Sequence, residues 1–123
     1  MNSRRNKTLV LSLAFVLQCV AIPVKVFAHA VLLESRPTTG AVIKGPVLSL
    51  WLRFNVRVDG SRSRCTLILP DGNIKPLSLD PQSKPDVLTT NAKQLSAGNY
   101  KLQWQVLAAD GHITRGELKL NVE

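Results

Sequence analysis

The sequence predicts an all-β fold, an immunoglobulin-like antiparallel β-sandwich of about seven strands with Greek-key connections. Apolar and polar residues alternate with period two in several runs, and Gly, Pro, Asp and Asn separate these runs at short intervals. The intervals between turns leave no room for a long helix. A chain of 123 residues, 45% of them apolar, is sized for one small folded unit with its own core.

The clearest strand pattern lies between Val47 and Val58, where only Trp51 interrupts the polar face. We expect Trp51 on a half-covered edge, with a partner surface as the alternative. The same alternation predicts strands at Tyr100–Leu107 and Arg115–Val122. Shorter runs between turn residues predict the other strands, at Val31–Glu34, Ala41–Ile43, Arg64–Leu69 and Val87–Thr90.

Two further features concern the connections and the core. Residues 71–86 contain three prolines and show little alternation, which predicts an irregular crossing from one sheet to the other. Trp104 has the buried parity of its strand and is expected to be the core tryptophan. Cys65 shares strand parity with Leu67 and Leu69, so we expect a buried thiol.

Residues 1–28 have the pattern of a secretory signal peptide that is cleaved from the mature domain, residues 29–123. A basic start precedes an apolar run from Thr8 to Ile22, which is too short for a convincing membrane span. The small-residue pattern that ends at Ala28 predicts cleavage after this residue, and a cut after Ala30 is the alternative. The pattern predicts export.

Removal of this segment changes what the net charge means. The whole chain carries +8, but residues 1–28 hold four of the sixteen basic residues and none of the eight acidic ones, which leaves +4 for residues 29–123. The remaining basic residues are scattered, and their one cluster lacks the interleaved aromatic residues that stack on bases. We therefore expect a solvated basic edge and no nucleic-acid partner. This cluster comprises Arg53, Arg57, Arg62 and Arg64.

The two histidines and one aspartate offer the most specific chemistry. Cleavage after Ala28 would make His29 the first residue, whose free α-amine and Nδ1 can close a chelate ring on one metal ion. Asp110 and His112 lie two apart, so in an extended segment they point to the same side. If the N-terminus lies beside this segment, the α-amine and two imidazoles supply three nitrogens and the carboxylate supplies one oxygen. Such a donor set suits Cu(II). An incidental histidine and an ordinary Asp-Gly turn are the alternative explanation of the same residues.

Several segments together closely resemble the CopC family of periplasmic copper-binding proteins of bacterial copper resistance and homeostasis. The resemblance covers essentially all of residues 29–123. Its most specific parts are His29, which directly follows the predicted cleavage site, and the segment that runs from Trp104 to Asp110 and His112. The segments are Ala28–Ala41, Leu50–Asn55, Gly98–Trp104 and Ala109–His112, with Gly116 after them.

The resemblance implies an immunoglobulin-like sandwich that binds one Cu(II) ion through His29, Asp110 and His112. It implies a carrier or buffer of copper rather than an enzyme, with a CopD-type inner-membrane protein as its associate, and we expect a monomer. Two positions depart from the family pattern. Val56 stands where some members place a glutamate near the copper, and Met1 is the only methionine, so a methionine-rich Cu(I) loop is missing.

Two other functions compete with copper carriage. A terminal histidine chelate with a second histidine is also the copper arrangement of lytic polysaccharide monooxygenases, but those enzymes are usually larger and keep an open copper face, where Asp110 would bind here. No aromatic row for sugar stacking is evident. The third hypothesis is a metal-free sandwich for adhesion or subunit contact, with Trp51 as its surface anchor.

Overall fold

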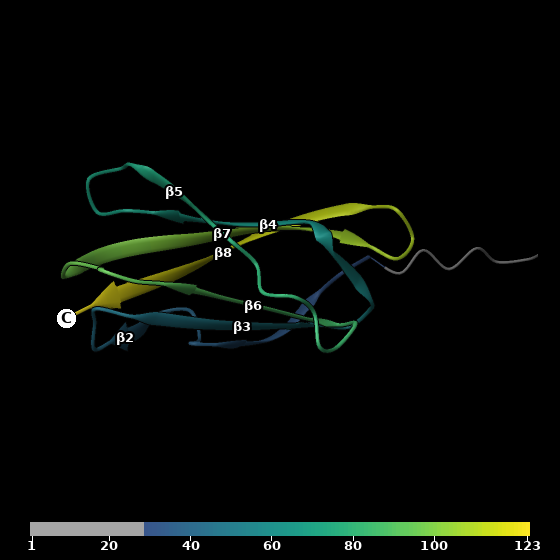
Figure 1. Ribbon diagram of the computed structural model, residues 1–123, viewed down its shortest axis with the longest axis horizontal. Helices are drawn as coiled ribbons and strands as arrows, with labels where there is room; N and C mark the ends of the chain where they lie inside the picture. Colours follow the sequence, from purple (N-terminus) through teal and green to yellow (C-terminus); the bar gives the residue numbers. More distant parts are fainter. Residues whose placement is uncertain (1–28) are drawn as a thin grey trace, which may run out of the picture.

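Two packed β-sheets make up residues 29–123, which are the residues that the computed structural model describes (Figure 1). The predicted signal peptide, residues 1–28, lies outside them. One sheet has the order β1 (Leu32–Arg36), β3 (Leu48–Phe54) and β6 (Val87–Ala92). The other has the order β2 (Ala41–Ile43), β8 (Ile113–Val122), β7 (Gly98–Ala108), β4 (Val58–Ile68) and β5 (Ile74–Leu77).

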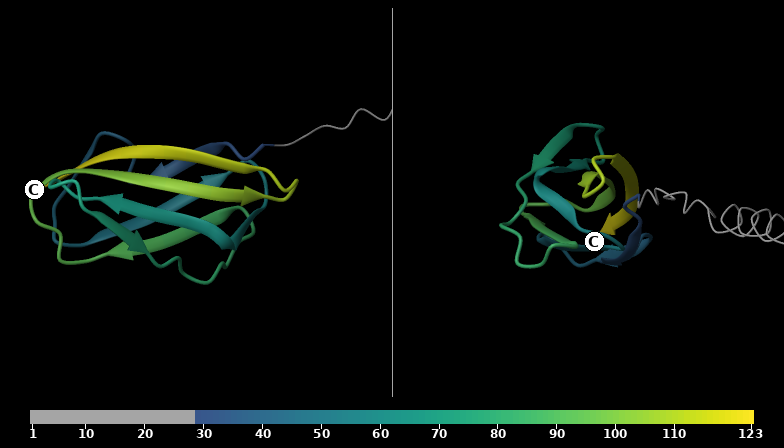
Figure 2. Two further views of the ribbon diagram at one scale, coloured as in Figure 1. Left: turned by 90° about the horizontal axis from the view of Figure 1, so that it is seen from above. Right: turned by 90° about the vertical axis from the view of Figure 1, so that its right-hand side faces the viewer.

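This arrangement confirms the predicted β-sandwich. Neighbouring strands pair antiparallel except at one edge, where β2 runs parallel to β8 with Ala41 opposite Leu120. The β7–β8 hairpin is the longest pairing and runs the length of the molecule (Figure 2). None of the secondary structure in residues 29–123 is a helix long and apolar enough to cross a membrane.

The core forms where the inward-facing side chains of the two sheets meet. The alternation predicted from the sequence appears directly in β3, whose Leu48, Leu50, Leu52 and Phe54 are all buried. Trp104 on β7 is buried as predicted, and its ring packs edge to face on Phe54 at a centroid distance of 5.3 Å. Burial of such apolar surface is the main stabilising term in a domain that has no disulfide in the described residues.

The predicted strand Val47–Val58 is wrong in its extent. β3 ends at Phe54, and Val58 already begins β4. Asn55 breaks the strand because its side chain and backbone bond to the segment that precedes β1. β4 also begins earlier than predicted, since an irregular register between Asp59 and Arg64 hides the first residues from a simple alternation pattern.

The expected irregular connection over residues 71–86 contains a strand that the sequence pattern missed. β5 pairs with β4 at the edge of the larger sheet, where Pro76 lies opposite Thr66. A proline is tolerated there because an edge strand needs hydrogen bonds on one side only. The rest of the connection is irregular and crosses from the larger sheet to β6 of the smaller one, as predicted.

Candidate metal centre

The three predicted ligands meet at one end of the sandwich. His29 precedes β1 in the smaller sheet, whereas Asp110 and His112 lie in the loop that joins β7 to β8 in the larger sheet. Each side chain offers a donor atom, and these atoms all lie within 4.8 Å of one another. Within residues 29–123 this is the one group of three such side chains found. Figures 1 and 2 show the start of the described chain, residues 29–31, beside the β7–β8 loop.

His29 is positioned by the residues that follow it and by Asn55. Ala30 is buried in the core, with 2% of its surface exposed. The Asn55 side chain accepts a hydrogen bond from the backbone N–H of Val31 at 2.7 Å and donates one to the carbonyl oxygen of His29 at 3.3 Å. The backbone N–H of Asn55 also donates to the Val31 carbonyl oxygen at 3.0 Å. The end of β3 therefore fixes where the His29 backbone lies.

A tight turn presents Asp110 and His112 together. The N–H of Gly111 donates to the Ala108 carbonyl oxygen, and the N–H of Ala108 donates to the His112 carbonyl oxygen, both at 2.9 Å. Gly111 has φ near +85°, a conformation that glycine adopts at little cost. Oδ1 of Asp110 accepts the backbone N–H of His112 at 3.0 Å, so the aspartate also closes the turn.

The carboxylate of Asp110 carries its charge at the centre of the group. Its side chain is only 16% exposed, and Oδ2 lies 3.0 Å from Nδ1 of His112. Oδ2 is buried and accepts no hydrogen bond of good geometry from the described residues. The backbone N–H of His112 holds the pKa of Asp110 below its ordinary value, and the two imidazoles act in the same direction. This carboxylate is therefore ionised at neutral pH.

The spacing of the donors fits a single metal ion. The ring centroids of His29 and His112 are 4.9 Å apart, with the ring planes inclined at 65°. Ligands bound at roughly 2.0–2.2 Å lie about 3 Å apart when adjacent and about 4 Å when opposite. The 3.0 Å between Asp110 Oδ2 and His112 Nδ1 is the spacing of adjacent ligands, and the 4.8 Å that includes all three donor atoms is close to the spacing of opposite ones.

The chemistry of this group is that of nitrogen and oxygen ligands. Residues 29–123 contain no methionine, and their one thiol, Cys65, is 2% exposed in the core, as predicted. Val56, which follows Asn55, is half-buried against the core and offers no donor atom. Imidazole and carboxylate donors without soft sulfur suit Cu(II) better than Cu(I).

Trp51 and the predicted basic cluster lie outside the metal group. Trp51 is half-buried, but it does not lie at an edge as expected: it is on β3, the central strand of the smaller sheet. There it is on the outer face, where the guanidinium of Arg36 lies 4.7 Å from its ring centroid. In the predicted basic cluster, Arg57, Arg62 and Arg64 are exposed, and Arg53 is half-buried and pairs with Glu34 at 3.4 Å.

Comparison with known proteins assigns the family. The family model described as "CopC domain" matches residues 32–123, which include the whole sandwich. The chain belongs to the CopC family. Copper-resistance proteins rather than enzymes make up this family, so the prediction that the chain is not an enzyme is confirmed and the monooxygenase alternative is set aside.

Individual CopC relatives have similar length and moderate identity. Copper resistance protein C of Xanthomonas campestris pv. juglandis is 28% identical over 105 residues, covering 79% of this chain and 82% of that protein. Protein YobA of Escherichia coli strain K12 is 29% identical over 101 residues, covering 80% and 82%. The crystal structure of CopC from Methylosinus trichosporium OB3b superposes with a TM-score of 0.72 at 27% identity, covering 77% of this chain and 94% of that one.

The sequence predicted His29, Asp110 and His112 as ligands, and these three side chains do meet, but it gave no role to Asn55. Its polar side chain fitted the alternation of the predicted strand, so nothing in the local pattern distinguished it from a residue facing solvent. An Asn at the end of a strand, in a segment shared with a family, is the signal that would have marked it. The structure shows its role, because its side-chain bonds reach across to the backbone beside His29.

Proposed function

We propose that this CopC-family protein is exported and binds one Cu(II) ion through His29, Asp110 and His112, as a periplasmic carrier or buffer of copper. The observation that carries the proposal is the convergence of three donor side chains within 4.8 Å, from two different sheets, at one end of the sandwich. A CopD-type inner-membrane protein is the partner that the family suggests for giving or receiving the ion.

Cleavage after Ala28 would complete the donor set. It frees the α-amine of His29, so amine and imidazole chelate the same ion, whereas an amide nitrogen must lose its proton to bind. The burial of Ala30 supports this cut over the alternative one after Ala30. The later cut would remove both His29 and a residue of the core, together with the carbonyl group that Asn55 contacts.

Each protein group has a distinct task toward the ion. Asp110 supplies negative charge that offsets part of the charge of Cu(II), and its bond to the His112 backbone sets the turn that aims the second imidazole. His29 is exposed and the His112 side chain is 47% exposed, so an incoming partner can reach the ion. Accessible ligands favour exchange with another protein, which is the behaviour of a carrier or buffer.

The decisive experiment compares N-termini. The full chain is expressed with export, the processed protein is sequenced from its N-terminus, and Cu(II) binding is measured by calorimetry and by electron paramagnetic resonance. We expect a protein that starts at His29 and binds one equivalent, with nitrogen hyperfine structure in the spectrum. A variant with one extra alanine before His29 keeps both imidazoles but loses the amine chelate, so we expect much weaker binding.

Substitution of the side chains separates their contributions. His29→Ala and His112→Ala should each weaken Cu(II) binding by at least tenfold, and circular dichroism checks that both variants remain folded. Lys84→Gln serves as the matched control, because Lys84 is exposed and lies outside the donor group.

If the protein with the extra alanine bound Cu(II) as tightly as the processed one, the proposed chelate by the α-amine and imidazole of His29 would be wrong. If processed protein did not bind Cu(II), the metal-free interaction module would replace this proposal.

A further inference from the structure

The outer face of the larger sheet carries a concentrated positive charge that copper binding does not use. Arg64 on β4, Lys101 on β7, and Arg115 and Lys119 on β8 are all exposed and alternate with inward-facing residues. Lys101 lies directly opposite Lys119, and Gln105 lies opposite both Arg64 and Arg115. The two rows of charge are four residues apart along the strands, or about 13 Å. We call these four side chains the basic face.

Little on the protein neutralises the basic face. Glu117, opposite Gln103, is the one acidic residue on β7 or β8 that faces outward, and it accepts a hydrogen bond from Gln103. The ion pairs found within residues 29–123 involve none of the four basic side chains. Like charges directly opposite each other, as at Lys101 and Lys119, destabilise a sheet unless an anion lies between them.

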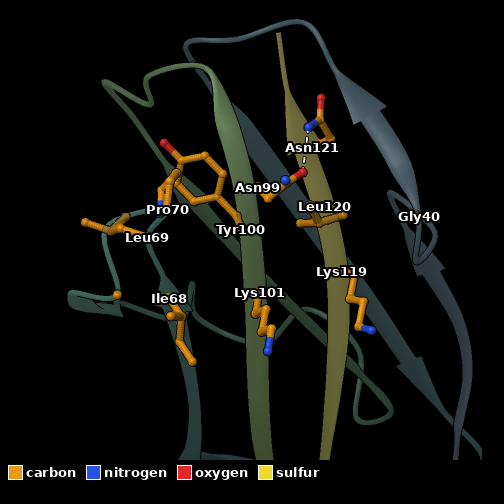
Figure 3. Close-up of a pocket in the computed structure, with 11 residues that line it drawn as sticks. Gly40, Ile68, Leu69, Pro70, Asn99, Tyr100, Lys101, Lys119, Leu120 and Asn121 are labelled. Atoms are coloured by element: carbon orange, nitrogen blue, oxygen red, sulfur yellow. Dashed lines mark hydrogen bonds between the residues drawn. The ribbon is translucent and has the colours of Figure 1, made fainter.

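Figure 3 shows the lysine end of the basic face. Lys101 and Lys119 extend side by side from neighbouring strands, and beyond them Asn121 donates a hydrogen bond to Asn99 at 2.7 Å. These residues line a shallow hollow of about 520 Å³, together with the apolar start of the β4–β5 turn around Leu69 on one side and Gly40 on the other. The hollow therefore combines two ammonium groups, two amides and apolar surface.

Exposed aliphatic side chains flank the two lysines on both sides. Ile74 on β5 is 69% exposed and lies opposite Ile68, which is itself opposite Lys101. Val42 on β2 is 58% exposed and lies opposite Asn121. Since β2 and β5 are the two edges of a five-stranded sheet, these aliphatic groups are about 19 Å apart with the lysines between them.

We propose that this face docks on the surface of a lipid bilayer that contains anionic lipid. Phosphate headgroups match the cations, and the aliphatic side chains at both margins enter the boundary between headgroups and acyl chains. An acidic protein surface would satisfy the cations but not the exposed Ile74 and Val42. The breadth of the charged area, two rows on three adjacent strands, matches an extended charged plane better than a single bound anion.

The copper group lies beyond the arginine end of the basic face. Asp110 and His112 are in the loop that precedes β8, three residues or more before Arg115, whereas Lys101 and Lys119 are at the far end of their strands. A domain that rests on its basic face therefore keeps the metal end at the margin of the contact. The inference goes beyond the proposed copper function and does not depend on it, so the two are tested by separate measurements.

Vesicle flotation tests the inference with the exported, processed protein. The probes are vesicles of equimolar phosphatidylglycerol and phosphatidylcholine, compared with vesicles of phosphatidylcholine alone. We expect binding to the anionic vesicles only, weakening as salt is raised. Because each lysine near an anionic surface contributes about fivefold to the partition coefficient, Lys101→Gln with Lys119→Gln should lower it about 25-fold.

Two further variants make the outcome specific. Lys84→Gln with Lys93→Gln removes the same charge beside β6 in the other sheet and should lower the partition coefficient much less. Ile74→Ser changes no charge and should lower the partition coefficient about fivefold.

Lack of binding to anionic vesicles, or an equal loss in the two double variants, would overturn the proposal. So would lysine-dependent binding to soluble heparin without vesicle binding. Cu(II) calorimetry on each variant is a separate readout that should remain unchanged.

Discussion

At the scale of single residues, Trp104 and Gly116 depend on each other. They are paired across β7 and β8, and a Cβ atom at Gly116 would overlap Cζ2 of the indole ring. The indole also keeps its N–H buried without a hydrogen-bond partner among the described residues. The fold accepts this cost because the ring covers the glycine and packs on Phe54.

Gly116→Ala should therefore lower the free energy of unfolding by about 1–3 kcal/mol, because the added methyl group forces the indole out of place. Urea denaturation followed by circular dichroism measures the change. The matched test is the same substitution in a Trp104→Phe background, where the smaller ring leaves room and the cost should fall. An equal cost in both backgrounds would show that the clash with the indole is not its cause.

Cys65 illustrates how burial controls reactivity. Desolvation in the core raises the pKa of its thiol to about 12, far above that of a free cysteine. For the processed protein, residues 29–123, we expect no labelling by a thiol reagent at pH 8 in the folded state and one equivalent of labelling in denaturant. Rapid labelling without denaturant would contradict this burial. Since unfolding lowers the thiol pKa to its ordinary value, the thiol also favours unfolding increasingly as the pH rises above about 9.

At the scale of elements, one side chain holds the long connection before β6. Oε1 of Gln82 accepts the N–H of Gly60 at 2.9 Å, and Nε2 donates to the carbonyl oxygens of Val58 at 3.1 Å and Val87 at 3.3 Å. These bonds tie the connection to the irregular start of β4 and to β6. An otherwise irregular segment thus crosses between the sheets on a defined path.

Gln82→Ala should lower the free energy of unfolding by about 1–3 kcal/mol, since it leaves the partly buried carbonyl groups unpaired. Amide exchange at Gly60 should also become faster. Denaturation and hydrogen exchange measure the two effects. Gln103→Ala on the solvent-facing side of β7 is the control and should change stability by less than about 0.5 kcal/mol. Equal effects of the two substitutions would refute the role assigned to Gln82.

The elements also show where prediction from sequence succeeds. Strands with one solvent-facing and one buried face, such as β3, β7 and β8, can be predicted from the alternation of polar and apolar residues, because burial on one side imposes period two. β5 was missed because an edge strand with Pro76 has weak alternation and few bonds. The break at Asn55 was missed because its cause is a contact with a distant part of the chain, which a local pattern does not contain.

The candidate metal site was likewise predicted only in part. Residue chemistry and the family resemblance identified His29, Asp110 and His112, and the structure brings them together. What the sequence did not predict is how they are held, through Asn55 on one side and the turn at Gly111 on the other. These supports are backbone contacts of ordinary residue types, so composition and spacing give no signal for them.

At the scale of the whole molecule, the proposed copper ligands belong to both sheets. His29 enters the smaller sheet through β1, and the other two donors belong to the β7–β8 hairpin of the larger one. A bound ion is then a bridge between the layers that exists only in the folded state. Any ligand that binds the folded state alone stabilises it by mass action.

Cu(II) should accordingly raise the melting temperature of the processed protein. At a free concentration of about 100 times Kd the stabilisation is about 2.7 kcal/mol. Thermal denaturation with and without Cu(II) measures it, and a chelator should reverse the shift. His112→Ala is the control and should show little shift at the same concentration. A shift of the same size in the variant would mean that Cu(II) acts elsewhere on the protein.

The placement of the donors on two sheets also sets an order of events in time. His29 precedes the first strand, whereas His112 immediately precedes the last, so the donors become neighbours only after both sheets have formed and packed. An unfolded chain holds the same histidines but no shared site. If the three donors hold copper as proposed, only the folded domain can capture the ion.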